Sequence, residues 1–329
     1  MNTSDVQKMM MKCIRNKANT NTKKKYQTAL NNLKYYIQQK NNLENTDEHI
    51  TRITNDNARI FMLDYQAYLK GNDIVQPKNI LCDNTINQYM VLVQTFLEDY
   101  CKITFKKHVK QLKVAKKQPR YLTTDRVNKI LLYIEMQRQM TTNKKSRNRT
   151  LDIAKVIIKL LFGTGLRIHE ALNLEVADIT KLEMDKHSNY QLNIIGKGTK
   201  TRTIIITSCV YNELFEHIKK YCNGKKYIFQ SVRTDKPMST YTIERYFNDL
   251  AKELDTYYNI TDKKQSYSYL LKPHNLRHSY AVNNMSRGVP INAMQKLLGH
   301  SSITTTQIYT DLLSDSLSEA IAKVEQQEI

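Results

Sequence analysis

The chain has 329 residues, of which 40% are hydrophobic and 25% charged, so its length suits about two domains that each bury a core. This composition excludes a disordered chain, a fibrous repeat and a disulfide-stapled miniprotein. The 51 Lys and Arg outnumber the 31 Asp and Glu, and the formal net charge of +20 points to a polyanionic partner, foremost nucleic acid.

The first predicted helix covers residues 22–40. Its apolar side chains recur at the spacing of one helix face: Tyr26, Leu30, Leu33 and Ile37. Its polar positions include a basic run that we expect to bind DNA, formed by Lys23, Lys24 and Lys25. Residues 1–120 hold 21 basic and 10 acidic side chains, a net charge of +11.

Two further helices are predicted in this part of the chain. One begins at an Asn55 or Asn57 cap and ends at Gly71. The other follows Asp83, and its apolar face is formed by Ile86, Met90, Val93 and Leu97. A few short helices with a basic surface predict a helical DNA-binding module over residues 1–112. The alternative is a bundle whose lysines are merely solvated.

A strongly basic segment follows, from Lys102 to Arg120, with eight basic residues and no acidic one. Pro119 prevents a helix at its end. Because uncompensated like charges repel unless a polyanion lies alongside, we predict a domain linker at 113–120 that follows DNA phosphates. The contacts expected from this segment are Lys106, Lys107, Lys110, Lys113, Lys116, Lys117 and Arg120.

A second domain is predicted over residues 121–329. It begins with a helix capped by Thr123 or Thr124, and its core helix is predicted at 151–162. The apolar pattern then changes from that of a helix to that of two β-strands, one on either side of residues 196–200. This predicts a β-hairpin with a basic tip. The remaining predictions are a helix at 240–252, a Tyr-rich loop at 257–272 and helices around 279–285 and 292–298. The expected fold class is mainly α with a small antiparallel β-sheet (α+β).

Four short groups carry residue types suited to phosphate chemistry. They are Gly163-Thr164-Gly165-Leu166-Arg167-Ile168-His169-Glu170, the hairpin Lys197, His274-Asn275-Leu276-Arg277-His278, and Leu298-Gly299-His300 followed by Tyr309. In this order they resemble the catalytic signature of the tyrosine recombinase (phage integrase) family, over about residues 120–312. The N-terminal helices fit that family's core-binding (SAM-like) domain in length, basicity and helix count. The resemblance implies a two-domain clamp that closes round duplex DNA and recombines it at specific sites.

The resemblance also implies a role for each residue. Arg167 and Arg277 would clamp the phosphate, because two guanidinium groups offer forked, always-charged donors to its oxygens. Tyr309 would be the nucleophile and form a 3′-phosphotyrosyl intermediate. A Tyr hydroxyl with a pKa of about 10 attacks poorly, but nearby arginine charge favours the phenolate. The bond energy stays in this linkage, so rejoining needs a 5′-hydroxyl and no ATP.

The leaving 5′-oxygen needs a proton, and a lysine on a hairpin can reach it. Lys197 is the expected general acid, and Lys200 is the runner-up. His274 would act as an acid or base at the tyrosine or hold the phosphate, and His300 would donate a hydrogen bond to a non-bridging oxygen.

Two residues are expected to support the site. Glu170 would orient His274 or Arg167, and His278 would stand beside the second arginine. Lys200 and Arg202 are also expected to bind DNA.

No metal or other cofactor is expected. The sequence lacks the converging carboxylates of a two-metal nuclease, the paired cysteines of a zinc site, and a P-loop or dinucleotide fingerprint. Two alternatives remain: a helix-turn-helix regulator without catalysis, because residues 279–298 also resemble that motif, and a topoisomerase of the related tyrosine type.

The end of the chain is acidic and amphipathic. As in the family, residues 314–329 are expected to form a tail helix that docks on another protomer of a tetramer on two DNA sites; the alternative is a helix packed on its own domain. Accessory proteins are possible partners. The sequence shows no signal peptide and no apolar run of the ~18 residues that a membrane span needs, so we expect no membrane partner and a cytoplasmic, nucleoid-associated protein.

Overall fold

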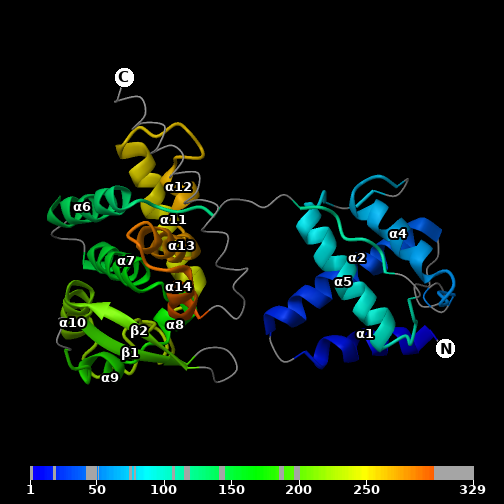
Figure 1. Ribbon diagram of the computed structural model, residues 1–329, viewed down its shortest axis with the longest axis horizontal. Coiled ribbons are helices and arrows are strands. Elements are labelled where there is room, and N and C mark those ends of the chain that lie inside the picture. The colour runs from blue at the N-terminus through cyan, green and yellow to red at the C-terminus, as the bar shows by residue number, and fades with distance from the viewer. Residues whose placement is uncertain are drawn as a thin grey trace. The chain divides into compact units, whose positions relative to one another are not determined.

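The computed structural model describes most of the chain up to residue 299. The described residues are 3–17, 20–41, 50, 52–73, 76–77, 79–105, 108–114, 119–140, 145–184, 189–195 and 201–299. The chain divides into two compact units, Met1–Lys116 and Lys117–Ile329 (Figure 1). The division falls inside the basic segment at 113–120.

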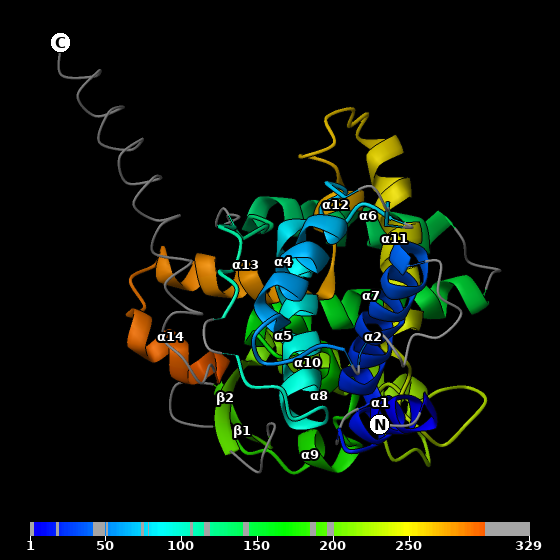
Figure 2. The same ribbon diagram turned by 90° about the vertical axis from the view of Figure 1, so that its right-hand side faces the viewer.

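The described secondary structure of the first unit is helical. Its helices are α1 (Thr3–Arg15), α2 (Thr20–Asn41), α4 (Ala58–Leu69) and α5 (Asp83–Asp99) (Figures 1 and 2). Helix α2 contacts each of the other three. At the centre, the ring of Tyr36 lies 5.4 Å from that of Tyr65 and 4.8 Å from that of Tyr68, and all three side chains are buried. This aromatic core holds together a unit whose surface is strongly basic.

Two predicted helix faces of this unit are confirmed. The buried residues of α2 include Tyr26, Leu30, Leu33 and Ile37, and those of α5 include Ile86, Met90, Val93 and Leu97. Helix α4 follows Asn57, one of its two predicted caps, and ends shortly before Gly71. Helix α1 has no predicted counterpart, because Cys13 is the one fully covered side chain among those described in it.

The second unit is built round α7 (Lys145–Thr164), which is buried on several sides. Four longer helices contact it: α6 (Thr124–Met140), α10 (Ser208–Tyr221), α11 (Thr240–Tyr257) and α13 (Pro273–Met285). The short helices are α8 (Ile168–Leu172), α9 (Val176–Thr180), α12 (Tyr267–Leu270) and α14 (Ile291–Leu298). Figure 1 shows α7 in the middle of this unit, as predicted for the core helix.

A β-hairpin completes the described part of the second unit. Strands β1 (Asn189–Ile195) and β2 (Thr201–Thr207) pair antiparallel, with Leu192 opposite Ile204. The predicted hairpin and the mainly α fold with a small antiparallel sheet are thereby confirmed. The hairpin tip, 196–200, lies outside the described residues.

The predicted loop at 257–272 is partly wrong. Helix α11 continues to Tyr257, and α12 forms within the predicted loop. The carboxylate of Asp255 accepts hydrogen bonds from the backbone N–H groups of Tyr267 and Ser268, at 2.5 and 3.0 Å. Helix α12 thus begins where its backbone bonds to a side chain 12 residues earlier in the chain. Local periodicity does not reveal a contact between residues so far apart.

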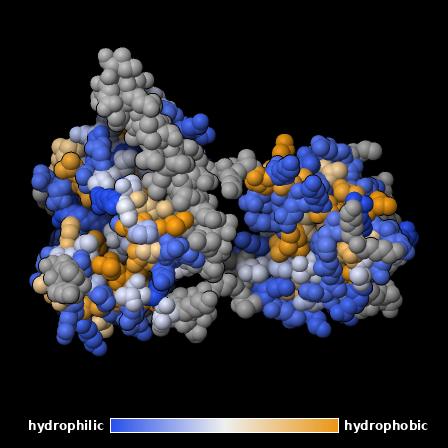
Figure 3. All heavy atoms as spheres, in the orientation of Figure 1, coloured by the Kyte–Doolittle hydropathy of each residue, from blue (hydrophilic) through white to orange (hydrophobic). Residues whose placement is uncertain are grey.

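The surface drawn in Figure 3 is mostly hydrophilic, with hydrophobic residues in small groups. Among the described residues, no helix combines the length and hydropathy needed to cross a bilayer. Within the same residues, no group of three His, Cys, Asp or Glu is placed to hold a metal ion.

Candidate active site

A tight turn between α7 and α8 positions Arg167. Gly165 in this turn adopts a φ of +64°, a region that glycine enters without steric cost. A Cβ atom at Gly165 would lie 2.4 Å from Cδ1 of Tyr280 on α13. Glycine is therefore required both by the backbone and by the close packing of the turn on α13, the helix that carries Arg277.

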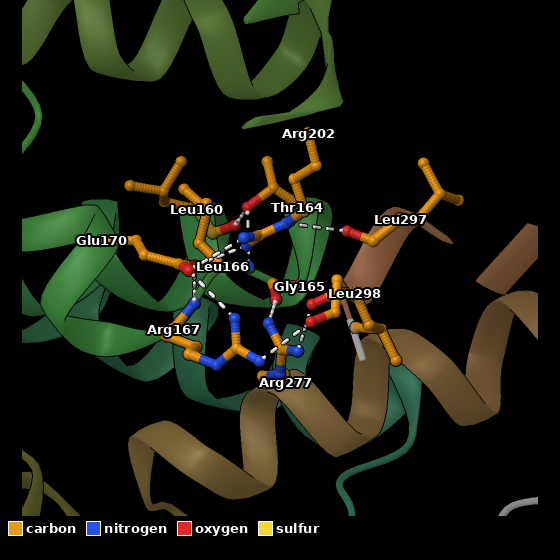
Figure 4. Close-up of polar contacts among 11 residues, drawn as sticks. Leu160, Thr164, Gly165, Leu166, Arg167, Glu170, Arg202, Arg277, Leu297 and Leu298 are labelled. Atoms are coloured by element: carbon orange, nitrogen blue, oxygen red, sulfur yellow. Dashed lines mark hydrogen bonds and ion pairs between the residues drawn. The ribbon is translucent and has the colours of Figure 1, made fainter. Parts of the chain in front are cut away.

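Arg277 is an almost completely buried cation, with 2% of its surface exposed. Its guanidinium donates hydrogen bonds to the carbonyl oxygens of Gly165 and Leu298, the latter at 2.6 Å (Figure 4). A guanidinium group keeps its charge in such surroundings. These bonds hold the fork between the α7–α8 turn and the end of α14.

Arg167 lies beside Arg277 and is more exposed, with 44% of its side chain accessible. Its guanidinium donates to Oε1 of Glu170 at 3.0 Å and to the carbonyl oxygen of Gly299 at 3.2 Å. Figure 4 shows the two guanidinium groups next to each other. The fold thus brings together two forked cations from distant parts of the sequence.

Glu170 links Arg167 to the hairpin. Its two carboxylate oxygens accept hydrogen bonds from Arg202 on β2, at 2.9 and 2.5 Å, and Oε2 also accepts one from the backbone N–H of Arg167 at 2.8 Å. Among the described residues, Glu170 bonds to Arg167 and Arg202 and not to His274. Of the two orienting roles expected of Glu170, the contacts fit the one toward Arg167.

The charge state of Glu170 follows from these contacts. Burial alone raises the pKa of a carboxyl group. Hydrogen bonds from Arg202 and from the backbone and side chain of Arg167 outweigh burial and lower the pKa of Glu170 to about 2. Glu170 is therefore an anion at neutral pH.

Arg202, which is predicted to bind DNA, is held by groups of the protein itself. Its side chain is 10% exposed, and its Nε donates to the carbonyl oxygen of Leu297 at 3.1 Å. Its other guanidinium nitrogens hold Glu170. These contacts engage the guanidinium within the protein, and DNA binding by Arg202 stays a prediction.

Three successive carbonyl groups at the end of α14 each accept a hydrogen bond from a different arginine. The pairs are Leu297 with Arg202, Leu298 with Arg277, and Gly299 with Arg167. A helix end carries unsatisfied carbonyls and partial negative charge, which guanidinium groups neutralise. The sequence indicated the Leu-Gly-His motif, but its spacing carries no signal for this junction, because the three arginines come from three separate elements.

His274 lies in the first turn of α13, one turn before Arg277. Burial, and then the charges of Arg277 and Arg167, lower the pKa of His274. Its ring centroid lies 4.3 Å from that of His278, with the rings edge to face. A neutral imidazole beside two guanidinium groups can accept a proton or a hydrogen bond.

Several predicted site residues lie outside the described residues. They are Lys197, Lys200, His300 and Tyr309, the lysines at positions 106, 107, 116 and 117, and the tail at 314–329. Gly299 is described, and His300 follows it directly in the chain.

Besides Arg202, six predicted DNA contacts are described: Lys23, Lys24, Lys25, Lys110, Lys113 and Arg120. Lys110 and Lys113 are exposed, and so is Arg120. The guanidinium of Arg120 stacks on the ring of Tyr269, 3.8 Å from its centroid.

Comparison with known proteins gives a consistent result. A model of the phage integrase family matches residues 120–315. Tyrosine recombinase XerA of Pyrococcus furiosus is 30% identical over 217 residues, which cover 64% of this chain and 64% of that protein. XerA of Pyrococcus horikoshii is 31% identical over 221 residues, 65% of each chain. The chain therefore spans less than two thirds of the length of either Pyrococcus relative.

Solved structures share the fold. A XerH site-specific recombinase bound to palindromic difH substrate superposes with a TM-score of 0.68, at 19% identity, over 98% of this chain and 85% of that one. The Tn1549 transposon integrase in complex with transposon right end DNA gives a TM-score of 0.62, at 20% identity, over 93% and 94%. At these identities the likeness establishes the fold alone.

Proposed function

The chain belongs to the phage integrase family, and from this premise we propose that it is a site-specific recombinase that cuts and rejoins duplex DNA through a 3′-phosphotyrosyl intermediate. The observation that supports it best is the pair of guanidinium groups of Arg167 and Arg277 at the end of α14 (Figure 4). A phosphodiester under attack gains charge on its non-bridging oxygens, and two fixed cationic forks stabilise that charge.

We propose the following roles for the reacting groups. The phenolate oxygen of Tyr309 attacks the phosphorus, and the bond from phosphorus to the 5′-oxygen breaks. Lys197, or else Lys200, supplies the proton to that leaving oxygen. His274, neutral beside the arginines, accepts a proton or holds the phosphate, and His300 donates to a non-bridging oxygen. Rejoining reverses these steps with a 5′-hydroxyl, without metal, cofactor or ATP.

We propose that the first unit binds the same duplex through α5 and the segment beside it. Asn87 of α5 holds the backbone of Leu112 through two hydrogen bonds, at 2.9 and 2.8 Å. This bond pair places the segment with exposed Lys110 and Lys113 along α5. Lysines on such a flank suit phosphate contacts. Replacing both by alanine should lower the slope of log Kd against log salt by about 2, and an unchanged slope would count against this surface.

We propose that the protein assembles as a tetramer on two duplex recombination sites at the nucleoid. The acidic tail at 314–329 docks on a neighbouring protomer, and accessory proteins are further partners. Deleting the tail should weaken cooperative synapsis in a gel-shift assay. Unchanged assembly on DNA would favour a tail packed on its own domain.

The proposal is tested with a nicked suicide substrate, chosen from random-sequence duplexes by binding to the protein. Wild-type protein should form a covalent adduct with the 3′-phosphate in the presence of EDTA, and Tyr309→Phe should form none. An adduct that persists in Tyr309→Phe would refute the nucleophile.

The suicide substrate and a plasmid-relaxation assay together separate the two alternative functions. A helix-turn-helix regulator would bind the selected duplex without any adduct. A topoisomerase would relax supercoiled plasmids that lack the selected sequence. The paired arginines and the neutral His274 favour the recombinase over the regulator, because a regulator has no use for two guanidinium groups held side by side next to an imidazole.

A further inference from the structure

We propose that Arg202 is a positioning residue for strand cleavage, which holds Arg167 and the end of α14 in a single arrangement. The inference rests on the proposed function, because it concerns the phosphate site of that reaction. Arg202 lies on β2 next to the hairpin tip, and its proposed role is separate from that of the lysines in the tip.

Hydrogen bonds through Glu170 connect Arg202 to Arg167. Arg202 grips both oxygens of Glu170, and Glu170 in turn accepts hydrogen bonds from the backbone and the guanidinium of Arg167. Side-chain exposure is 10% for Arg202 and 11% for Glu170, so the pair is shielded, whereas the side chain of Arg167 is 44% exposed. An exposed arginine has many rotamers, and the buried pair restricts them to those that reach Glu170.

Arg202 also contacts the end of α14 directly. Its Nε donates to the carbonyl oxygen of Leu297, and its aliphatic stem lies against Gly299. A Cβ atom at Gly299 would lie 2.8 Å from Cδ of Arg202. The stem of Arg202 thus occupies the space that a side chain at 299 would need, and Gly299 caps α14 with a φ of +62°.

The contacts at position 202 require an arginine and not a lysine. One guanidinium group here serves a carboxylate through two nitrogens and a carbonyl through a third. A lysine carries a single charged nitrogen and cannot hold both partners in this planar arrangement. Figure 4 shows Arg202 reaching Glu170 on one side and Leu297 on the other.

Arg202 also connects the hairpin to the helices beside Arg167 and Arg277. Arg202 pairs with Ile194 across the strands, next to the end of the described hairpin. In the sequence, Lys197 and Lys200 lie between the two strands, three and six residues after Ile194. The described hairpin is therefore anchored to α8 and α14 near its tip by one side chain.

The test compares Arg202→Lys and Arg202→Gln with wild type in single-turnover cleavage of the nicked substrate at saturating protein. We expect the cleavage rate to fall at least tenfold in both variants. The Kd for DNA should stay within about twofold, and the slope of log Kd against log salt should not change, because the side chain contacts no phosphate. Combining Arg202→Gln with Glu170→Gln should cost little more than either change alone, because both act on Arg167.

The control is Arg138→Gln on α6. Arg138 is also ion-paired, with Nε 2.7 Å from the carboxylate of Asp152, but neither residue contacts the site. It should lower the thermal midpoint without changing the cleavage rate, which separates a general loss of stability from mispositioning.

Hydrogen exchange supplies a readout that does not depend on cleavage. Peptides that cover 291–299 should exchange faster in Arg202→Lys than in wild type or Arg138→Gln. A wild-type rate in the Arg202 variants, or unchanged exchange at the end of α14, would overturn the inference. A salt slope reduced by about 1 would instead make Arg202 a phosphate contact. Failure of the wild type itself to form an adduct would refute the proposed function, and hydrogen exchange would still decide whether Arg202 holds α14.

Discussion

The guanidinium of Arg277 lies 2.6 Å from the carbonyl oxygen of Leu298, the last residue of α14 (Figure 4). The same group bonds to the carbonyl oxygen of Gly165, so one side chain joins the α7–α8 turn to a second helix end. Arg167 makes the corresponding contact one residue further on, with Gly299, but from a much more exposed position. The two arginines therefore share a site and differ in how much of the fold depends on them.

This difference predicts separate effects of Arg277→Ala and Arg167→Ala. Both should lower the cleavage rate at least 100-fold, because each removes a cation that stabilises the transition state. Arg277→Ala should also lower the free energy of unfolding by about 3 kcal/mol, since it leaves buried carbonyls without donors. Arg167→Ala should cost less than about 1 kcal/mol, because its ion pair is partly solvated. Urea denaturation measures both values, and equal losses of stability would contradict the structure.

The turn at Gly165 predicts a large effect of a single methyl group. Gly165→Ala places Cβ 2.4 Å from the ring of Tyr280, in addition to the strain of a φ of +64°. Gly224 is a matched control, because its φ is +68° and no described atom lies within 4 Å of its Cβ position. Gly224→Ala should cost about 1 kcal/mol, from backbone strain alone. Gly165→Ala should cost at least about 2 kcal/mol more.

Thermal denaturation of the two glycine variants measures this difference. Similar midpoints for Gly165→Ala and Gly224→Ala would show that the turn does not pack on α13 as described.

Glu170 predicts an acid-sensitive contribution to stability. Its pKa of about 2 in the folded protein is below its ordinary value of 4.5, so the folded state binds this proton less readily than the unfolded state does. The stabilisation, about 3 kcal/mol, is therefore present above pH 4.5 and is lost as the pH falls toward 2. Glu170→Gln should remove most of this pH dependence, and chemical denaturation at pH 7 and pH 3.5 compares the two proteins. An unchanged acid loss in Glu170→Gln would rule out this carboxylate as its source.

His274 predicts a titration midpoint below its ordinary value of 6.5 in the DNA-free protein. The unfolded state binds this proton more readily, so the group favours folding above pH 6.5 and opposes it as the pH falls below that value. Arg167→Ala should raise the midpoint, because it removes one of the two charges that lower it. NMR of ring-labelled histidine measures the midpoint, and His274→Asn identifies the signal. A wild-type midpoint at or above 6.5 would place His274 away from the arginines.

Much of the fold was predictable because the signals are local. The faces of α2 and α5 follow helical spacing, and the alternation before and after 196–200 predicts the hairpin. Helix α12 was not predictable, since it starts where Asp255 accepts hydrogen bonds from the N–H groups of Tyr267 and Ser268. Helix α1 was not predicted, although Met9, Met10 and Ile14 pack against the core beside the buried Cys13.

The sequence by itself determined the family and the fold class, because short motifs and local periodicity carry that information. Tertiary structure alone decided that Arg202 bonds to Glu170 and Leu297, and that three arginines meet at one helix end. The physical reason is that a charged side chain has the same local pattern whether it points to solvent or to a partner. Its role is decided by which distant carboxylates and carbonyls the packed helices place within hydrogen-bond reach.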